Sequence, residues 1–230
     1  VDNSVTDAKD PITRQTPKRM LASTEIVGNG TSRLFNTSVE KFTLHIKDLV
    51  LRNGVADKGG LILAGGQVNM LNSIIKNSSA TVSGGAIYLE GNDAHLTSTD
   101  TTWENLTAKV GSVVGMSCLI GLNPTKHNIS FFRSAVLNNG NANSNSIIQL
   151  CGQSELTADN TTIAKNIVSK PADNKSGIIY AVDTDSLGKV SLNYATVVEN
   201  IGTSALSYGK FGILNIKSSI LAFNDNSCFD

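Results

Sequence analysis

The sequence has little of what marks helical, metal-binding or membrane-spanning proteins. Its 230 residues include 3 Cys, 4 Pro and 1 Trp, and only 17% are charged. No run of 18 apolar residues occurs, so we expect no transmembrane helix. Lys plus Arg equals Asp plus Glu at 19 each, so no net charge attracts nucleic acid or an anionic membrane. A Gly-Lys-Ser/Thr phosphate loop, zinc-type Cys spacing and a Gly-x-Ser-x-Gly elbow are all missing, and we expect no cofactor.

What the sequence does contain is a repeated pattern of two small or polar residues followed by two aliphatic ones. From Leu61 to Ala205, the first aliphatic residues of six copies are spaced 25, 27, 34, 31 and 27 residues apart. This period is typical of stacked supersecondary units, which bury their apolar faces only against one another. The copies begin at Gly59, Gly84, Gly111, Asn145, Ser176 and Thr203.

A second pattern ends in Asn and runs in phase with the first. Its copies are residues 73–77, 101–105, 134–138, 162–166 and 196–200, with looser ones at 49–53 and 220–224. Alternating runs such as 42–46 precede them, and this alternation indicates strands, whereas Asn and Gly at the ends indicate turns. We therefore expect three short strands per repeat. The recurrent Asn suits a left-handed corner, with its amide stacked on the Asn of the next repeat.

Three strands per repeat predict an all-β fold, a right-handed single-stranded parallel β-helix of about seven rungs. The rungs are expected to begin near Leu34, Leu61, Ala86, Val113, Ile147, Ile178 and Ala205. Alternation directs one set of side chains inward: Ile62, Ala64, Ile87, Leu89, Val114, Met116, Ile148, Leu150, Ile179 and Ala181. Leu63, Tyr88, Gly115, Gln149 and Tyr180 are expected to point outward. Polar residues 1–22 are predicted to form an arm or cap, and residues 23–230 the β-helix domain.

The three cysteines, Cys118, Cys151 and Cys228, are too few for a disulfide framework. Aligning the repeats places Cys151 opposite Ser117, one position from Cys118, so strand alternation directs the two side chains to opposite faces. We therefore expect two free, partly buried thiols. A Cys118–Cys151 disulfide is the alternative.

Residues capable of catalysis or metal binding are scattered along the chain. Glu90 and Asp183 are expected three rungs apart, and Asp183 with Asp185 suits a solvated turn better than a Ca²⁺ site. His45, His95 and His127 do not share a register, so we predict surface imidazoles and no metal site. The sequence thus assigns no catalytic, cofactor-binding or metal-binding residue.

Seven Asn-x-Ser/Thr sequons occur, which would accept glycans in a secreted eukaryotic protein. β-Helix corners also favour Asn, Ser and Thr, so the sequons do not identify the source. They lie at Asn29, Asn36, Asn77, Asn105, Asn128, Asn160 and Asn174.

Residues 84–88, Gly-Gly-Ala-Ile-Tyr, resemble the GGAI element of chlamydial polymorphic outer-membrane proteins and of other bacterial β-helix surface proteins. Residues 26–35 and 49–54 look like the first rungs of such proteins, and the likeness covers about residues 24–224. The family's FxxN element is replaced here by forms such as residues 103–105. The resemblance implies an extracellular autotransporter passenger or stalk, associated with the outer membrane and often adhesive.

We therefore expect a secreted or surface-displayed, non-enzymatic module that binds a host-cell or glycan ligand. One alternative is a carbohydrate-active enzyme of the lyase or glycosidase type, and another is a structural spacer or tailspike segment. The sequence ends shortly after Asn224 without a visible closing element. We expect further rungs, a cap, a membrane anchor or a partner chain to cover the apolar residues of 211–229.

Overall fold

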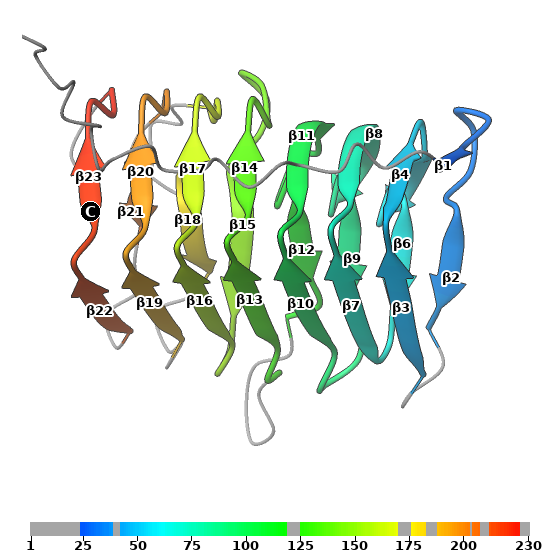
Figure 1. Cartoon of the computed structure of the whole chain (residues 1–230), viewed down its shortest axis with the longest axis horizontal. Helices are drawn as coiled ribbons and strands as arrows, with labels where there is room; N and C mark the ends of the chain where they lie inside the picture. Colours follow the sequence, from blue (N-terminus) through cyan, green and yellow to red (C-terminus); the bar gives the residue numbers. More distant parts are fainter. Residues whose placement is uncertain are drawn as a thin grey trace, which may run out of the picture.

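The computed structural model describes residues 24–38, 42–118, 125–169, 176–182, 188–202, 204–207 and 212–225. Within these ranges the chain forms strands and turns and no helix, and every strand pair is parallel. Figure 1 shows successive strands side by side along one axis, from β1 and β2 at one end to β22 and β23 at the other. The predicted arm, residues 1–22, and the pair Asp183 and Asp185 lie outside the described residues.

The chain winds through three parallel sheets, named A, B and C here, and most turns contribute one strand to each. The exception is the turn that contributes both β4 and β5 to sheet A, where both pair with β8. Sheet A holds β1 (Thr24–Val27), β4 (Leu49–Arg52), β5 (Val55–Lys58), β8 (Ile74–Ser83), β11 (Thr102–Thr107), β14 (Ala135–Leu137), β17 (Thr162–Ala164), β20 (Thr196–Val198) and β23 (Ile220–Ala222). Sheet B holds β2 (Phe35–Thr37), β6 (Ile62–Ala64), β9 (Ile87–Leu89), β12 (Val114–Met116), β15 (Ser146–Cys151), β18 (Gly177–Val182) and β21 (Leu206–Ser207). Sheet C holds β3 (Thr43–Lys47), β7 (Gln67–Leu71), β10 (His95–Thr99), β13 (Asn128–Phe132), β16 (Glu155–Asp159), β19 (Lys189–Asn193) and β22 (Ile213–Lys217). The predicted parallel β-helix is confirmed, and seven strands in each of sheets B and C agree with about seven rungs.

The core lies between the three sheets and consists of stacked aliphatic side chains. Every residue predicted to point inward from sheet B is buried, and the register pairs Ile62 with Ile87, and Ile87 in turn with Val114. Trp103 fills the core beside Phe131, with ring centroids 5.9 Å apart in an edge-on contact. Its Nε1 donates a hydrogen bond to Ser98 Oγ at 2.9 Å, so the buried indole N–H has a partner.

The outer face of sheet B is less exposed than alternation alone predicts. Leu63 and Tyr180 are half-buried, but Tyr88 and Gln149 are buried. Lys58 Nζ lies 4.9 Å from the Tyr88 ring centroid, and Ser83 Oγ donates to Gln149 Oε1 at 3.3 Å. Residues from the ends of β5 and β8 therefore cover part of this face.

Single residues in the left-handed conformation turn the chain between sheets. After sheet C these have φ between 46° and 57°: Asp48, Asn72, Asp100, Arg133, Asn160, Tyr194 and Ser218. Within or directly after the strands of sheet A, Asn53, Asn77, Asn105 and Asn138 take this conformation, as predicted, with φ between 52° and 60°. Asn tolerates this region better than most side chains.

The stacked asparagines form a ladder one residue beyond these corners, which corrects the predicted alignment. Ala135 pairs with Thr162, so Asn166 lies beside Asn139, whereas the sequence pattern had aligned Asn166 with Asn138. Each amide Nδ2 donates to the Oδ1 of the next Asn at 2.9 to 3.0 Å along a ladder of four residues: Asn139, Asn166, Asn200 and Asn224. Stacking is thus confirmed for Asn166, Asn200 and Asn224. Stacking is wrong for Asn105 and Asn138, which take the left-handed conformation instead. The predicted left-handed conformation is wrong in turn for Asn166, Asn200 and Asn224, where the preceding residue adopts it.

The two cysteines described by the structure form a disulfide, so the prediction of free thiols is wrong. The Cα atoms of Cys118 and Cys151 are 5.5 Å apart. The prediction assumed that side chains alternate between the two faces as far as Cys118. Because β12 ends at Met116, Cys118 lies outside the strand and its side chain does not follow this alternation. Gln149 and Cys151 lie on the same side of β15. The Cys118 Sγ accepts a hydrogen bond from Gln149 Nε2 at 3.4 Å, so Cys118 faces the side of β15 that carries Cys151.

Candidate functional site

The outer face of sheet C is a polar surface built by strand alternation. In β3, Leu44 and Ile46 face the core, whereas Thr43, His45 and Lys47 are exposed. The central outward position carries a polar residue in every turn, and the strand register aligns these into one column: His45, Asn69, Thr97, Ser130, Thr157, Ser191 and Asn215. Neighbouring members are separated by the strand spacing of about 4.8 Å. The column therefore offers a regular series of hydrogen-bonding groups along the axis.

The first turns of this face are tied together by side-chain hydrogen bonds. Gln67 Nε2 donates to Asn69 Oδ1 at 3.1 Å, and Asn69 Nδ2 lies 3.4 Å from His45 Nδ1. These bonds hold the Asn69 amide in one orientation. A concave region of about 320 Å³ adjoins them, lined by His45, Ile46, Lys47, Asn69, Met70, Leu71, Thr97 and Thr99.

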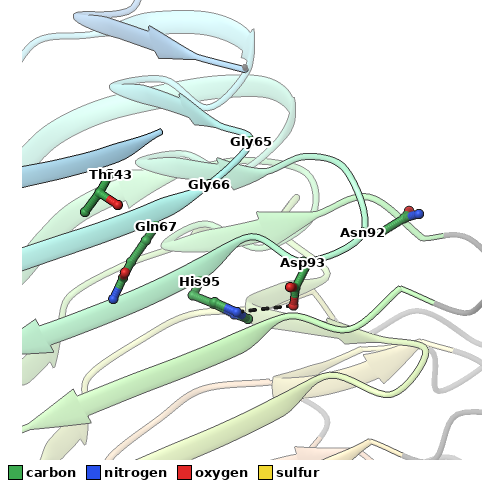
Figure 2. Close-up of a pocket in the computed structure, with 7 residues that line it drawn as sticks. All are labelled: Thr43, Gly65, Gly66, Gln67, Asn92, Asp93 and His95. Atoms are coloured by element: carbon green, nitrogen blue, oxygen red, sulfur yellow. Dashed lines mark ion pairs between the residues drawn. The ribbon is translucent and has the colours of Figure 1, made fainter. Parts of the chain in front are cut away.

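A second hollow, of about 450 Å³, lies at the edge of the same face where the chain enters sheet C. Figure 2 shows the residues that line it: Thr43, Gly65, Gly66, Gln67, Asn92, Asp93 and His95. Gly65 and Gly66 join β6 to β7, and Asn92 and Asp93 precede β10. A Cβ at Gly66 would collide with the Phe42 carbonyl oxygen, so only glycine lets the chain pass here. We call this hollow the β7–β10 cleft.

His95 is the most fully anchored polar side chain in the β7–β10 cleft. Its Nδ1 accepts a hydrogen bond from the Asn128 backbone N–H at 3.2 Å, and its Nε2 lies 3.2 Å from Asp93 Oδ1 (Figure 2). Because Nδ1 acts as an acceptor, the neutral ring carries its proton on Nε2 and donates it to Asp93. The Asp93 side chain is 78% exposed, so its second oxygen remains accessible to a ligand.

The three histidines occupy different environments. As predicted, they do not share a register: His45 lies on the central column, His95 lines the cleft, and His127 precedes β13. The prediction of a surface imidazole is wrong for His127, which is fully buried, with Nδ1 3.0 Å from Ala94 O and Nε2 3.5 Å from Ser117 Oγ. Burial lowers the pKa of His127, because desolvation disfavours the imidazolium.

Within the described ranges, no three His, Cys, Asp or Glu side chains gather closely enough to hold a metal ion. Over the same ranges, no helix is long and apolar enough to cross a bilayer.

Sequence reasoning did not single out Gln67, Asn69, Asn92 or Asp93. The available signal was the 28-residue offset between β7 and β10, which places His95 beside Gln67. That offset differs from the spacing in other turns, so the columns of sheet C could not be aligned without the strand register.

Comparison with known proteins gives no match: no protein-family model, no curated protein and no solved structure corresponds to this chain.

Proposed function

We propose that this protein is a non-enzymatic binding module, secreted or displayed at the cell surface, that holds a saccharide along the outer face of sheet C. The observation that carries this proposal is the central column of amide, hydroxyl and imidazole groups, one per turn from His45 to Asn215. Its repeat of about 4.8 Å is close to the rise per sugar residue in an extended pyranose chain. A glycan lying along the stack would therefore meet one polar side chain per sugar.

The Cys118–Cys151 disulfide supports the location. Disulfides persist in oxidising compartments such as the periplasm and the cell exterior, and they are rare in the cytosol. Together with the resemblance to bacterial β-helix surface proteins, it favours an adhesin-like passenger module with a host-cell or glycan ligand. In this setting the stack acts as the rigid support and the polar face of sheet C as the contact surface.

A glycan array followed by titration of the best ligand tests the proposal. Replacing Asn69 with Ala, or Thr97 with Val, is expected to weaken binding about fivefold each, because each removes one hydrogen bond of about 1 kcal/mol. Thr162→Val is the matched control, since Thr162 is an exposed threonine on sheet A. The proposal fails if no glycan binds, which favours a structural spacer, or if Thr162→Val weakens binding as much as Thr97→Val.

A carbohydrate-active enzyme is the second candidate, and the His95–Asp93 pair in the β7–β10 cleft favours it. His95 orients the Asp93 carboxylate, whose second oxygen is accessible and can exchange a proton with a bound sugar. Incubation with a polysaccharide panel separates the two functions. Release of unsaturated or reducing ends, lost in Asp93→Asn, would establish an enzyme, whereas binding without turnover supports the binding module.

A further inference from the structure

A separate cleft of about 520 Å³ lies away from sheet C, on the side where the chain passes from sheet A to sheet B. The ends of β8 and β11 form one wall, and the loop before β15 forms the other. Its lining consists of Ala80, Thr81, Thr107, Ala108, Lys109, Asn141, Ala142, Asn143, Asn145 and Ser169. We call it the Lys109 cleft. No lining residue belongs to sheet C, so it is independent of the surface described above.

Hydrogen bonds within the chain fix the loop that forms the second wall. Asn141 N–H donates to Ser144 Oγ at 3.1 Å, and Ser144 N–H donates back to Asn141 O at 2.9 Å. Asn145 N–H donates to Lys109 O at 2.7 Å, which joins the two walls. Ser144 is fully buried and its Oγ accepts from Ser112 Oγ at 3.1 Å. The cleft is therefore largely preformed.

The internal hydrogen bonds of the Lys109 cleft occupy amide oxygens and leave amide N–H groups without a partner among the described residues. Asn141 Oδ1 accepts from the Asn143 backbone N–H at 2.8 Å, and Asn145 Oδ1 accepts from Ser169 Oγ at 3.1 Å. Both amides thereby have a fixed orientation, and within the described ranges their Nδ2 groups make no hydrogen bond. The Asn143 side chain and the Lys109 ammonium likewise have no partner among the described residues. Three amide groups and one cation thus face the cleft, and its lining contains no carboxylate.

We propose that the Lys109 cleft binds an acidic saccharide through a carboxylate or sulfate group. Lys109 supplies the charge that attracts the anion, and the amides of Asn141, Asn143 and Asn145 donate hydrogen bonds to it and to ring hydroxyls. The buried methyl groups of Ala80 and Ala108 give an apolar floor for the C–H face of a sugar ring. A metal cation does not fit a lining dominated by N–H donors.

Calorimetric titration of the protein with oligogalacturonate, with its neutral methyl ester and with a sulfated disaccharide tests this site. We expect an acid form to bind at least tenfold more tightly than the neutral ester, and less tightly as salt is raised from about 50 to about 200 mM. A preference for oligogalacturonate assigns a carboxylate ligand, and a preference for the sulfated disaccharide assigns a sulfate. Equal binding of acid and ester, or no binding of either acidic probe, overturns the proposal.

Two variants and two controls locate the binding. Lys109→Gln is expected to reduce affinity at least fivefold, and Asn145→Asp to abolish binding by placing a negative charge in the cleft. Lys126→Gln, an exposed lysine elsewhere, and Thr162→Val on sheet A are expected to leave acidic-glycan affinity unchanged. If Lys126→Gln weakens binding as much as Lys109→Gln, the attraction is non-specific and the assignment is wrong. Equal melting temperatures of Lys109→Gln and wild type exclude an effect through folding.

Discussion

Asparagine has two distinct roles at the corner after sheet A. Asn138 takes the left-handed conformation with φ of 55°, whereas Asn166 is fully buried and belongs to the ladder. Asn166 Oδ1 accepts from the backbone and amide N–H groups of Asn139 at 2.9 and 3.0 Å. Its Nδ2 donates to Val136 O at 3.0 Å and to Asn200 Oδ1 at 2.9 Å. The first role depends on backbone freedom, and the second depends on the whole amide group.

The two roles predict different costs of substitution. Asn166→Ala is expected to lower the free energy of unfolding by about 3 kcal/mol, because buried donors of Asn139 lose their acceptor. Asn138→Gly is expected to change it by less than about 0.5 kcal/mol, because Gly adopts positive φ without strain. Urea denaturation of both variants measures the difference. Equal losses would show that the ladder contributes no more than the corner conformation.

The buried His127 makes stability depend on pH. Its pKa is lowered in the folded state from an ordinary value of 6.5, so the unfolded chain binds the proton more readily. The contribution of neutral His127 to the free energy of unfolding is fully present above pH 6.5. It is lost as the pH falls below 6.5, by up to about 1.4 kcal/mol per pH unit. Denaturation at pH 8 and pH 5 is expected to show a smaller difference for His127→Gln than for wild type. An unchanged difference would assign the pH dependence to other groups.

At the scale of single strands, alternation predicted the fold well, and its failures have a local cause. The inward residues of sheet B were correct because β6, β9, β12, β15 and β18 keep an in-phase register. Cys118 was misplaced because it lies beyond the end of β12. The Asn ladder was misaligned because the later turns place Lys165 and Glu199, not Asn, at the left-handed corner. A period-2 pattern carries no information on where a strand stops or which residue turns.

The Cys118–Cys151 disulfide connects the end of β15 to the segment that follows β12, the neighbouring strand of sheet B. It closes a segment with a sequence separation of 33 residues, for which the chain-entropy model gives a stabilisation of about 3 to 4 kcal/mol. Reduction is expected to lower the melting temperature of the wild type. Cys118→Ser is expected to melt lower than wild type without reductant and to show no further change when reductant is added. A wild-type melting temperature insensitive to complete reduction, checked by thiol titration, would contradict this.

At the scale of the whole molecule, each turn contacts mainly its neighbours, so the stack is expected to tolerate an added turn. Ile74 pairs with Thr102, so residues 74–101 form one 28-residue turn. Inserting a second copy after residue 101 should keep the fold, increase the strand signal in circular dichroism and lengthen the particle by about 4.8 Å. A Gly/Ser insert of equal length is the control and should add no strand signal. If the duplicated protein shows the same strand content as the control, turns are not interchangeable units.

The architecture could be predicted from sequence because a repeated pattern reports a repeated structure. The binding surfaces could not, since they depend on which outward residues align across turns of unequal length. Gln67 and His95 lie 28 residues apart, whereas Glu155 and Lys189, adjacent on the same face, lie 34 apart. The Lys109 cleft depends in addition on how a long loop folds back. The repeat period of the sequence does not predict the conformation of that loop.

The asparagine ladder also bears on how this protein ages chemically. Asn139 is followed by Gly140, a dipeptide in which the glycine nitrogen readily attacks the amide carbon and releases ammonia. In the folded chain that nitrogen donates to Leu106 O at 2.8 Å, and the Asn139 amide is bonded to Trp103 O and Asn166 Oδ1. Attack would require breaking this network, and the resulting carboxylate would face two oxygen atoms in a dry interior. The extent of deamidation at Asn139 would therefore measure the total time that a molecule has spent with these hydrogen bonds broken.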